Sequence, residues 1–194
     1  MTLTSKFEQA LVYSTVVHAA QSRKGTAIPY IAHLLAVTSI VLEHGGTETE
    51  AIAALLHDAV EDAGGRGRLE NISARFGNDV AEIVEACSDA ETQPKPPWRE
   101  RKVAYINRIS KKSAAARLVS AADKLHNARA ILADYRVLGE DLWVRFAGKK
   151  DGTLWYYRSL VTAFRAAGDS PLIQELDRVV TQLEHLADGR GESL

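Results

Sequence analysis

Four ionisable side chains stand close together in the otherwise apolar segment 53–62. His57 and Asp58 are adjacent, and Glu61 and Asp62 follow one helical turn later. In a helix, residues four apart are neighbours, so His57 would lie beside Glu61, and Asp58 beside Asp62. Burying such groups costs free energy unless they are paired or bind a metal ion. The spacing therefore favours a metal or proton-transfer site. The alternative is a solvated acidic helix edge with a hydrogen-bonded histidine.

Two more residues of the same types lie in other apolar helical segments. His33 closes the sequence PYIAH, early in one predicted helix, and Asp123 lies in AADKLHN, within another. A His-Asp dipeptide alone is weak evidence, because it occurs by chance in many proteins. Because His33 and Asp123 are also present, a cluster of metal-ligand-type side chains is a better interpretation than a chance dipeptide.

Five motifs follow one another along the chain, over about residues 7–130. They are HAAQSRK at 18–24, PYIAH at 29–33, AALLHDAVED at 53–62, FGNDV at 76–80 and ADKLHNAR at 122–129. Together they resemble the HD-domain phosphohydrolases. More narrowly, they resemble the alarmone hydrolases, which comprise the hydrolase domain of the bifunctional RelA/SpoT enzymes and the stand-alone small alarmone hydrolases.

The resemblance implies a divalent metal centre. Its implied ligands are His33, His57, Asp58 and Asp123. Two imidazoles and two carboxylates with open positions suit Mn²⁺, the usual ion of the family, or another borderline divalent ion. Glu61 and Asp62 match the pair that orients or deprotonates the attacking water. For this pair the alternative is an exposed helix surface.

The resemblance also implies substrate contacts. They are Arg23, Lys24, Tyr30, Lys124 and Asn127. An arginine can stack on a purine base and bind a phosphate through two hydrogen bonds, whereas a lysine supplies one positive charge. Asn127 follows Asp123 by four residues, so both can face one cavity. Solvated surface for Arg23 and Lys24, and core packing for Tyr30, are the alternatives.

The implied reaction is metal-dependent hydrolysis of the 3′-diphosphate of (p)ppGpp to GDP or GTP plus pyrophosphate. The sequence departs from the usual pattern at Leu34, Ala63 and the segment 85–89. These departures keep open hydrolysis of an adenine alarmone or of the NADPH 2′-phosphate. A catalytically silent nucleotide-sensing module is a third hypothesis, but all the implied ligands and both carboxylates are present.

Composition sets the class of protein. The chain has 194 residues, 46% of them hydrophobic and 25% charged, with a net charge of −1. We expect one soluble domain, 1–194, with no bulk attraction to nucleic acid or an anionic membrane. Cys87 is the single cysteine, so no internal disulfide forms. Residues 1–8 lack an apolar leader and no segment has membrane-spanning length, which predicts a cytoplasmic protein.

Helical periodicity predicts an all-α fold with a motif-bearing core and C-terminal helices at about 139–187. We expect helices near 4–22, 31–44, 47–62, 69–76, 77–88, 98–112, 113–134, 139–147, 151–167 and 170–187. Thr47 and Glu50 have the spacing of a capping box. The proline-bearing segment 89–97 is expected to be a loop.

For two features of the C-terminal third, a basic cluster and an aromatic run, the sequence leaves alternatives open. Arg145, Lys149 and Lys150 either close over distal phosphates or form a solvated loop, which we favour. The aromatic run at 155–157 is expected to pack between helices or to form an oligomer contact rather than a base-stacking platform.

Overall fold

The computed structural model describes residues 2–62, 64–88 and 96–189. These residues form helices and connecting loops, and the only β-type pairing among them is an isolated bridge between Ser22 and Pro29. The predicted all-α class is therefore confirmed. The expected loop at 89–97 lies, as far as residue 95, outside the described residues.

The chain divides into two compact units. Unit 1 consists of residues 1–96 and 112–123, and unit 2 consists of residues 97–111 and 124–194. The helix α8 (Ala114–Leu138) begins in unit 1 and ends in unit 2. The single domain expected over 1–194 stays a prediction. In the described parts of both units, no helix combines the length and the apolar character needed to cross a membrane.

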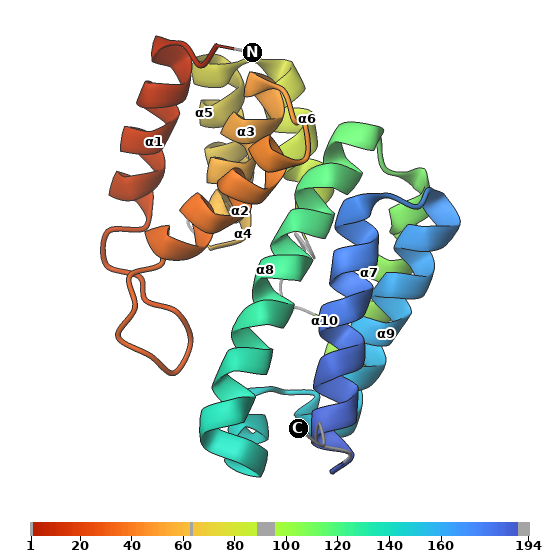
Figure 1. Ribbon diagram of the computed structural model, residues 1–194. Helices are drawn as coiled ribbons and strands as arrows, with labels where there is room; N and C mark the ends of the chain where they lie inside the picture. The colour runs from red at the N-terminus through yellow and green to blue at the C-terminus, as the bar shows by residue number, and fades with distance from the viewer. Residues whose placement is uncertain (1, 63, 89–95, 190–194) are drawn as a thin grey trace. The chain divides into compact units, whose positions relative to one another are not determined.

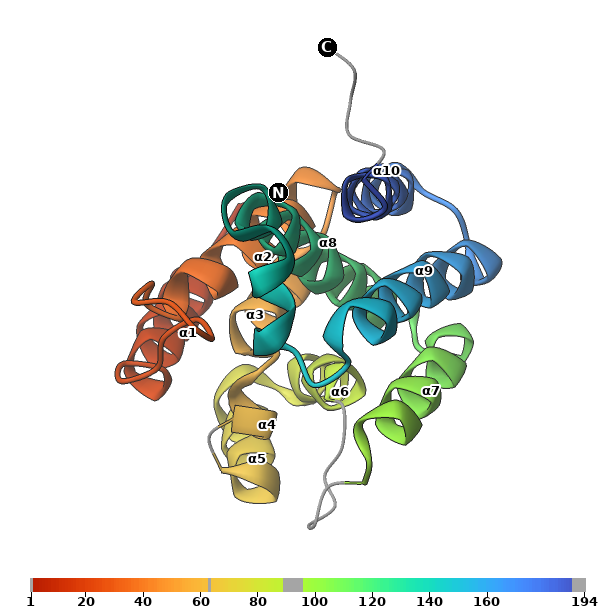
Figure 2. The ribbon, with the colours of Figure 1, turned by 90° about the horizontal axis from the view of Figure 1, so that it is seen from below.

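Unit 1 is built around a short buried helix (Figures 1 and 2). Its helices are α1 (Ser5–Val17), α2 (Ile31–Glu43), α3 (Glu48–Leu56), α4 (Ala59–Asp62), α5 (Gly65–Phe76) and α6 (Asn78–Cys87). α1, α2 and α6 pack against α3, while α5 packs against α4 and α6. Residues 51–56 of α3 are all buried. The central helix therefore fixes the positions of the helices around it.

The predicted helix at 47–62 is correct at its start and wrong in its middle. Glu50 N–H donates to Thr47 Oγ1, and Thr47 N–H donates to the Glu50 carboxylate, so the predicted capping box is present. α3 ends at Leu56, and α4 begins only at Ala59. The His57 ring takes the Ala54 carbonyl as its acceptor at 2.8 Å. In a continuous helix that carbonyl would accept from the backbone N–H of Asp58.

Unit 2 is formed by helices that pack on α9. Around α9 (Lys149–Ala167) lie α7 (Trp98–Arg108), the 3-10 helices η1 (Ile109–Lys111) and η2 (Gly139–Arg145), and α10 (Pro171–Ala187). The predicted helix at 139–147 is thus a 3-10 helix instead of an α-helix. α10 begins with a Ser170 side chain that accepts from Ile173 N–H, followed by Pro171 at the first helical position.

The aromatic run at 155–157 packs between helices, which is one of the two arrangements expected from the sequence. The ring centres of Trp155 and Tyr156 each lie 6.3 Å from that of Trp98 on α7. Tyr156 and Tyr157 are buried. These rings therefore contribute to the core of unit 2.

Arg145 and Lys150 form partly exposed ion pairs within unit 2, and the choice between a solvated loop and contact with phosphates stays a prediction. Arg145 forms an ion pair with Asp134 at 3.1 Å, and Lys150 forms one with Glu140 at 2.8 Å. Lys150 also donates to the carbonyl of Ala187 at the end of α10. These two basic residues hold the segment before α9 against the rest of unit 2.

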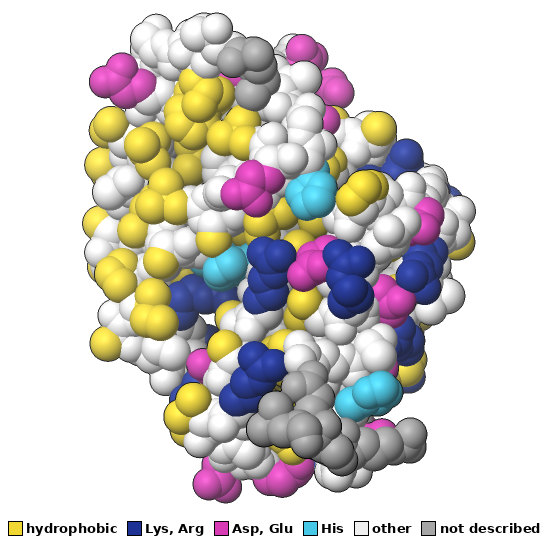
Figure 3. Space-filling model, in the orientation of Figure 1, with side chains coloured by type: hydrophobic (Ala, Val, Ile, Leu, Met, Phe, Trp, Pro, Cys, Tyr) yellow, Lys and Arg dark blue, Asp and Glu magenta, His cyan; other side chains and the backbone are white. Residues whose placement is uncertain are grey.

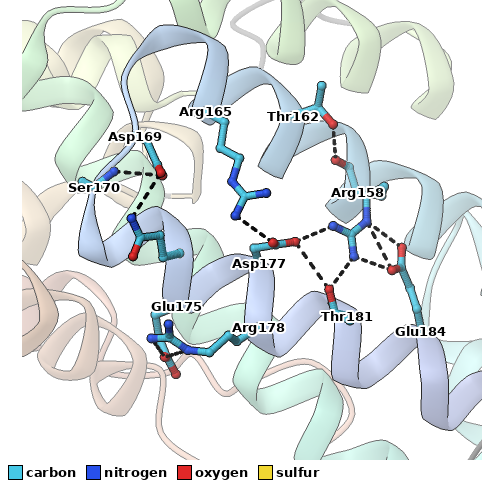
Figure 4. Close-up of polar contacts among 11 residues, drawn as sticks. Arg158, Thr162, Arg165, Asp169, Ser170, Glu175, Asp177, Arg178, Thr181 and Glu184 are labelled. Atoms are coloured by element: carbon cyan, nitrogen blue, oxygen red, sulfur yellow. Dashed lines mark hydrogen bonds and ion pairs between the residues drawn. The ribbon is translucent and has the colours of Figure 1, made fainter.

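A cluster of polar side chains joins α9 to α10 (Figure 4). The Arg158 guanidinium on α9 donates to Glu184 at 3.0 Å and to Thr181 at 2.9 Å, and it forms an ion pair with Asp177. Arg165 also pairs with Asp177, at 2.9 Å. Several shared, forked contacts make such a network stronger than an isolated surface ion pair.

We expect Arg158→Ala to lower the free energy of unfolding by about 1–2 kcal/mol, because it leaves carboxylates on α10 without their shared partner. Urea unfolding followed by circular dichroism measures the change. Arg178→Ala is the matched control, because Arg178 pairs with Glu175 on its own helix and is 67% exposed. Equal losses in both variants would contradict a special role for the Arg158 network.

Candidate metal centre

Three helices of unit 1 bring the predicted ligands together. His33 lies in the first turn of α2, His57 and Asp58 lie between α3 and α4, and Asp123 lies on α8. His57 Nε2 is 3.1 Å from Asp58 Oδ2 and 3.7 Å from Asp123 Oδ1. His33 Nε2 is 3.5 Å and 3.3 Å from the same two oxygens. The four side chains therefore converge on one point, while their role as metal ligands stays a prediction.

The His57 hydrogen bond decides which ring nitrogen can bind a metal. Nδ1 contacts the Ala54 carbonyl, which can only accept, so Nδ1 carries the proton. Nε2 then has a lone pair directed at the cluster, where it is buried and makes no hydrogen bond. A backbone partner on the second nitrogen is the usual support of a metal-binding histidine. The buried lone pair and the mixed nitrogen and oxygen donors fit a divalent cation.

The carboxylates of the cluster favour a positive charge, either a proton or a cation, beside the His57 ring. Burial lowers the pKa of His57, but Asp58 and then Asp123 raise it, and the net pKa is above its ordinary value. Burial raises the pKa of Asp58, but His57 and His33 lower it, and the net pKa is below its ordinary value. Asp58 thus stays ionised in a site where His33 and His57 are almost completely buried.

Tyr30 supports a predicted ligand directly. Its hydroxyl donates to Asp58 Oδ2 at 2.6 Å. Burial and the nearby Asp58 charge raise the pKa of Tyr30, so its hydroxyl remains a donor. The sequence predicted that Tyr30 contacts substrate. The structure adds this hydrogen bond to Asp58, while the substrate role stays a prediction.

A second network, which the sequence interpretation missed, holds Asp62. The Gln21 amide donates to Asp62 Oδ2 at 2.8 Å, and its oxygen lies 2.6 Å from His18 Nδ1. The His18 ring is buried and stacks on Tyr30, with ring centres 5.1 Å apart. Gln21 belongs to the motif at 18–24, and its amide type was the available signal. Sequence alone did not show that the chain folds back towards α4.

Burial raises the pKa of Asp62 above its ordinary value. The Gln21 hydrogen bond opposes this change, and the charges of Asp58 and Glu61 add to it. A carboxylate with a raised pKa is a better proton acceptor near neutral pH than an ordinary one. Asp62 therefore combines a fixed position with useful basicity. Glu61 lies beside it on α4 and is partly exposed.

The other predicted site residues are the four expected to contact substrate at positions 23, 24, 124 and 127. Arg23 and Lys24 lie in a loop whose ends are joined by hydrogen bonds from Arg23 N–H to Ile28 and from Tyr30 N–H to Gln21. The Arg23 guanidinium is 5.8 Å from the centre of the Tyr30 ring. Lys124 and Asn127 belong to the part of α8 in unit 2. Their expected position beside Asp123 in a common cavity stays a prediction.

Comparison with known proteins identifies a family and several relatives. The HD domain family matches residues 10–153. A Xenopus tropicalis protein named guanosine-3′,5′-bis(diphosphate) 3′-pyrophosphohydrolase MESH1 is 40% identical over 124 residues, which cover 62% of this chain and 66% of that protein. The Homo sapiens protein of the same name is 36% identical with the same coverage. The alignments thus span about two thirds of these relatives.

A solved structure extends the similarity to nearly the whole chain. It belongs to a metazoan SpoT ortholog described as hydrolysing ppGpp, and it is 28% identical with a TM-score of 0.79. The match covers 94% of this chain and 98% of that one. The bifunctional (p)ppGpp synthase/hydrolase SpoT of Escherichia coli K12 is 31% identical over 132 residues, or 65% of this chain and 18% of that protein.

We expect Tyr30→Phe to weaken Mn²⁺ binding by roughly tenfold, because Asp58 loses the donor that orients it. Isothermal titration calorimetry on metal-stripped protein measures this affinity. Tyr135→Phe removes a comparable hydroxyl–carboxylate contact, with Glu140 in unit 2, and should leave Mn²⁺ affinity unchanged. If Tyr30→Phe binds Mn²⁺ as tightly as the unmodified protein, the Tyr30 hydroxyl does not support the metal ligands.

Proposed function

Because the chain belongs to the HD-domain family, we propose that it hydrolyses the 3′-diphosphate of (p)ppGpp, giving GDP or GTP and pyrophosphate. The observation that carries the proposal is the buried convergence of His33, His57, Asp58 and Asp123. Relatives named for this activity support the choice of substrate. We keep the expected cytoplasmic location as part of the proposal.

His33, His57, Asp58 and Asp123 would hold the metal ion, for which we propose Mn²⁺. When bound, a divalent ion supplies Lewis acidity, which lowers the pKa of water and polarises a phosphoryl oxygen. The chain contributes the orientation of the donors. The Ala54 carbonyl fixes His57, and the Tyr30 hydroxyl fixes Asp58.

Asp62 is the proposed proton acceptor. Its Oδ2 is engaged by the Gln21 amide, so Oδ1 can take the proton of the water molecule that attacks the 3′-bound phosphorus. Glu61, the next residue back on α4, is the proposed partner that orients this water. After the bond to the ribose 3′-oxygen breaks, the proton held on Asp62 can be released to solvent or to a product oxygen.

Substrate binding is proposed for residues on two segments. Arg23 and Lys24 extend from the loop before α2, where the Arg23 guanidinium can stack on the base and the Lys24 ammonium can offset phosphate charge. Tyr30 lies beside this loop and would line the base pocket. Lys124 and Asn127 are proposed to contact the phosphates and ribose.

Alternative substrates gain no support from the departures at positions 34 and 87. Leu34 is completely buried in α2, and the Cys87 sulfur lies 3.5 Å from Ser120 Oγ on α8. Leu34 therefore packs inside unit 1, Cys87 is half-buried against α8, and neither is among the predicted substrate contacts. Ala63 lies outside the described residues. We accordingly propose no adenine alarmone or NADPH activity.

Purified protein supplied with Mn²⁺ should release pyrophosphate from ppGpp, and removing the metal with a chelator should stop the reaction. Coupled assays that separate pyrophosphate from orthophosphate measure the products. His57→Ala should lower kcat at least a thousandfold, because it removes a proposed ligand. Orthophosphate as the main product would instead indicate a phosphomonoesterase, and no turnover of ppGpp would refute the proposal.

Gln21→Leu should lower kcat for ppGpp roughly 10–100-fold while changing KM little, because Asp62 loses its orienting donor. Steady-state kinetics separate the two constants. Gln174→Leu is the matched control, since that amide donates to Asp169 in unit 2. An effect confined to KM, or equal effects in both variants, would contradict a positioning role for Gln21.

A further inference from the structure

An apolar groove in unit 1 lies apart from the metal-centre residues. Its volume is about 720 Å³, and its lining includes Val12, Tyr13 and Val16 of α1 together with Arg75 and Phe76 of α5. Val12 and Val16 are 60% and 70% exposed. Figure 3 shows hydrophobic side chains gathered on the surface over α1. The volume lies within the range of small-molecule pockets, which are also mostly apolar.

A second hollow, here called the arginine pocket, adjoins the groove through Tyr13 and Arg75. It is about 430 Å³ in volume and is also lined by Arg68 and Asn71. The Arg68 and Arg75 guanidinium carbons lie 5.6 Å and 5.4 Å from the centre of the Tyr13 ring. The Tyr13 hydroxyl donates to Asn71 and accepts from Arg68. The Tyr13 ring thus lies beside two cationic groups where the arginine pocket meets the apolar groove.

Positive charge lies at the arginine pocket, and negative charge lies along the groove at Glu8. No acidic residue lines the arginine pocket, and Arg75 forms no ion pair within the described part of the chain. Arg66, earlier on the same helix, pairs with both Glu70 and Glu85. Glu8 lines the groove one to two turns before Tyr13 on α1. An elongated anion would therefore be attracted at the arginine pocket and repelled near Glu8.

We propose that the groove and the arginine pocket together bind an anionic amphiphile, an organic carboxylate with an aliphatic chain. The carboxylate would lie between Arg68 and Arg75, because guanidinium groups bind carboxylates through directed, charge-assisted hydrogen bonds. The chain would cover Val12, Val16 and Phe76. Val12 and Val16 lie one helical turn apart, about 6 Å along α1 at 1.5 Å per residue, so a chain of medium length extends over both.

Octanoate is the probe for this site. Titration of isotope-labelled protein, followed by nuclear magnetic resonance of valine methyl groups and the Tyr13 ring, should show saturable shifts at Val12, Val16 and Tyr13. Octylammonium has the same chain with the opposite charge, and acetate has the carboxylate without the chain. Both should bind at least tenfold more weakly than octanoate.

Variants separate the two parts of the site. Arg75→Gln should weaken octanoate binding at least fivefold by removing the charge, and Val16→Ser should weaken it by removing apolar contact. Arg66→Gln and Val144→Ser are the matched controls, because Arg66 pairs with glutamates and Val144 is exposed in unit 2. Neither control should change the affinity. Unfolding midpoints of all four variants establish that each is folded.

Several outcomes would overturn the proposal. They are the absence of saturable shifts, equal affinity for octylammonium, and indifference of octanoate binding to both Arg75→Gln and Val16→Ser. Concentration-dependent self-association that is lost in Val16→Ser would assign the surface to a second copy of the chain instead. The experiment measures octanoate binding directly, and the residues that it changes lie outside the proposed catalytic set. Its failure is therefore distinguishable from a failure to release pyrophosphate from ppGpp.

Discussion

The hydrogen bond between the His57 ring and the Ala54 carbonyl is the contact on which the candidate site depends. It lies where α3 ends at Leu56, on the carbonyl that would face the Asp58 N–H in a continuous helix. It also fixes the proton on Nδ1 and leaves Nε2 to face the other predicted ligands. The interruption is brief, because Asp62 N–H donates to the Asp58 carbonyl at 3.0 Å. α4 therefore carries Glu61 and Asp62 within one turn of Asp58.

Neutral donors orient the carboxylates of the site without cancelling their charge. Asp58 accepts from the Tyr30 hydroxyl, and Asp62 accepts from the Gln21 amide. An arginine or lysine in either place would orient the carboxylate equally well, but it would also compete with a divalent cation for the negative charge. His18 joins the two donors, since its ring stacks on Tyr30 and contacts Gln21. The donors that orient the two carboxylates are thus both in contact with the same histidine ring.

The sequence predicted the all-α class, because helical periodicity is a local signal. It pointed to His33, His57, Asp58 and Asp123 through ordered motifs and a family resemblance, and the structure places these four side chains close together. It did not predict the break at His57, because a hydrogen bond from a side-chain ring to the backbone does not change the periodic pattern of apolar residues. It also missed Gln21, whose approach to Asp62 requires the loop before α2 to fold back. The Arg158 network was equally invisible, because its partners on α10 lie about 20 residues or more away. Such contacts depend on tertiary packing, which residue spacing does not encode.

Small side chains are buried on α3, which precedes two of the predicted ligands, and on α1, which lines the apolar groove. Ala51, Ala53 and Ala54 are completely buried on α3, where their size lets neighbouring helices come near. The His33 and His57 rings consequently lie with centres 5.3 Å apart. α1 likewise buries only Ala10 and Ser14 fully within its span, while Val12 and Val16 remain at the surface. Small residues thus face inward on α1, while the larger Val12 and Val16 lie outside and line the groove.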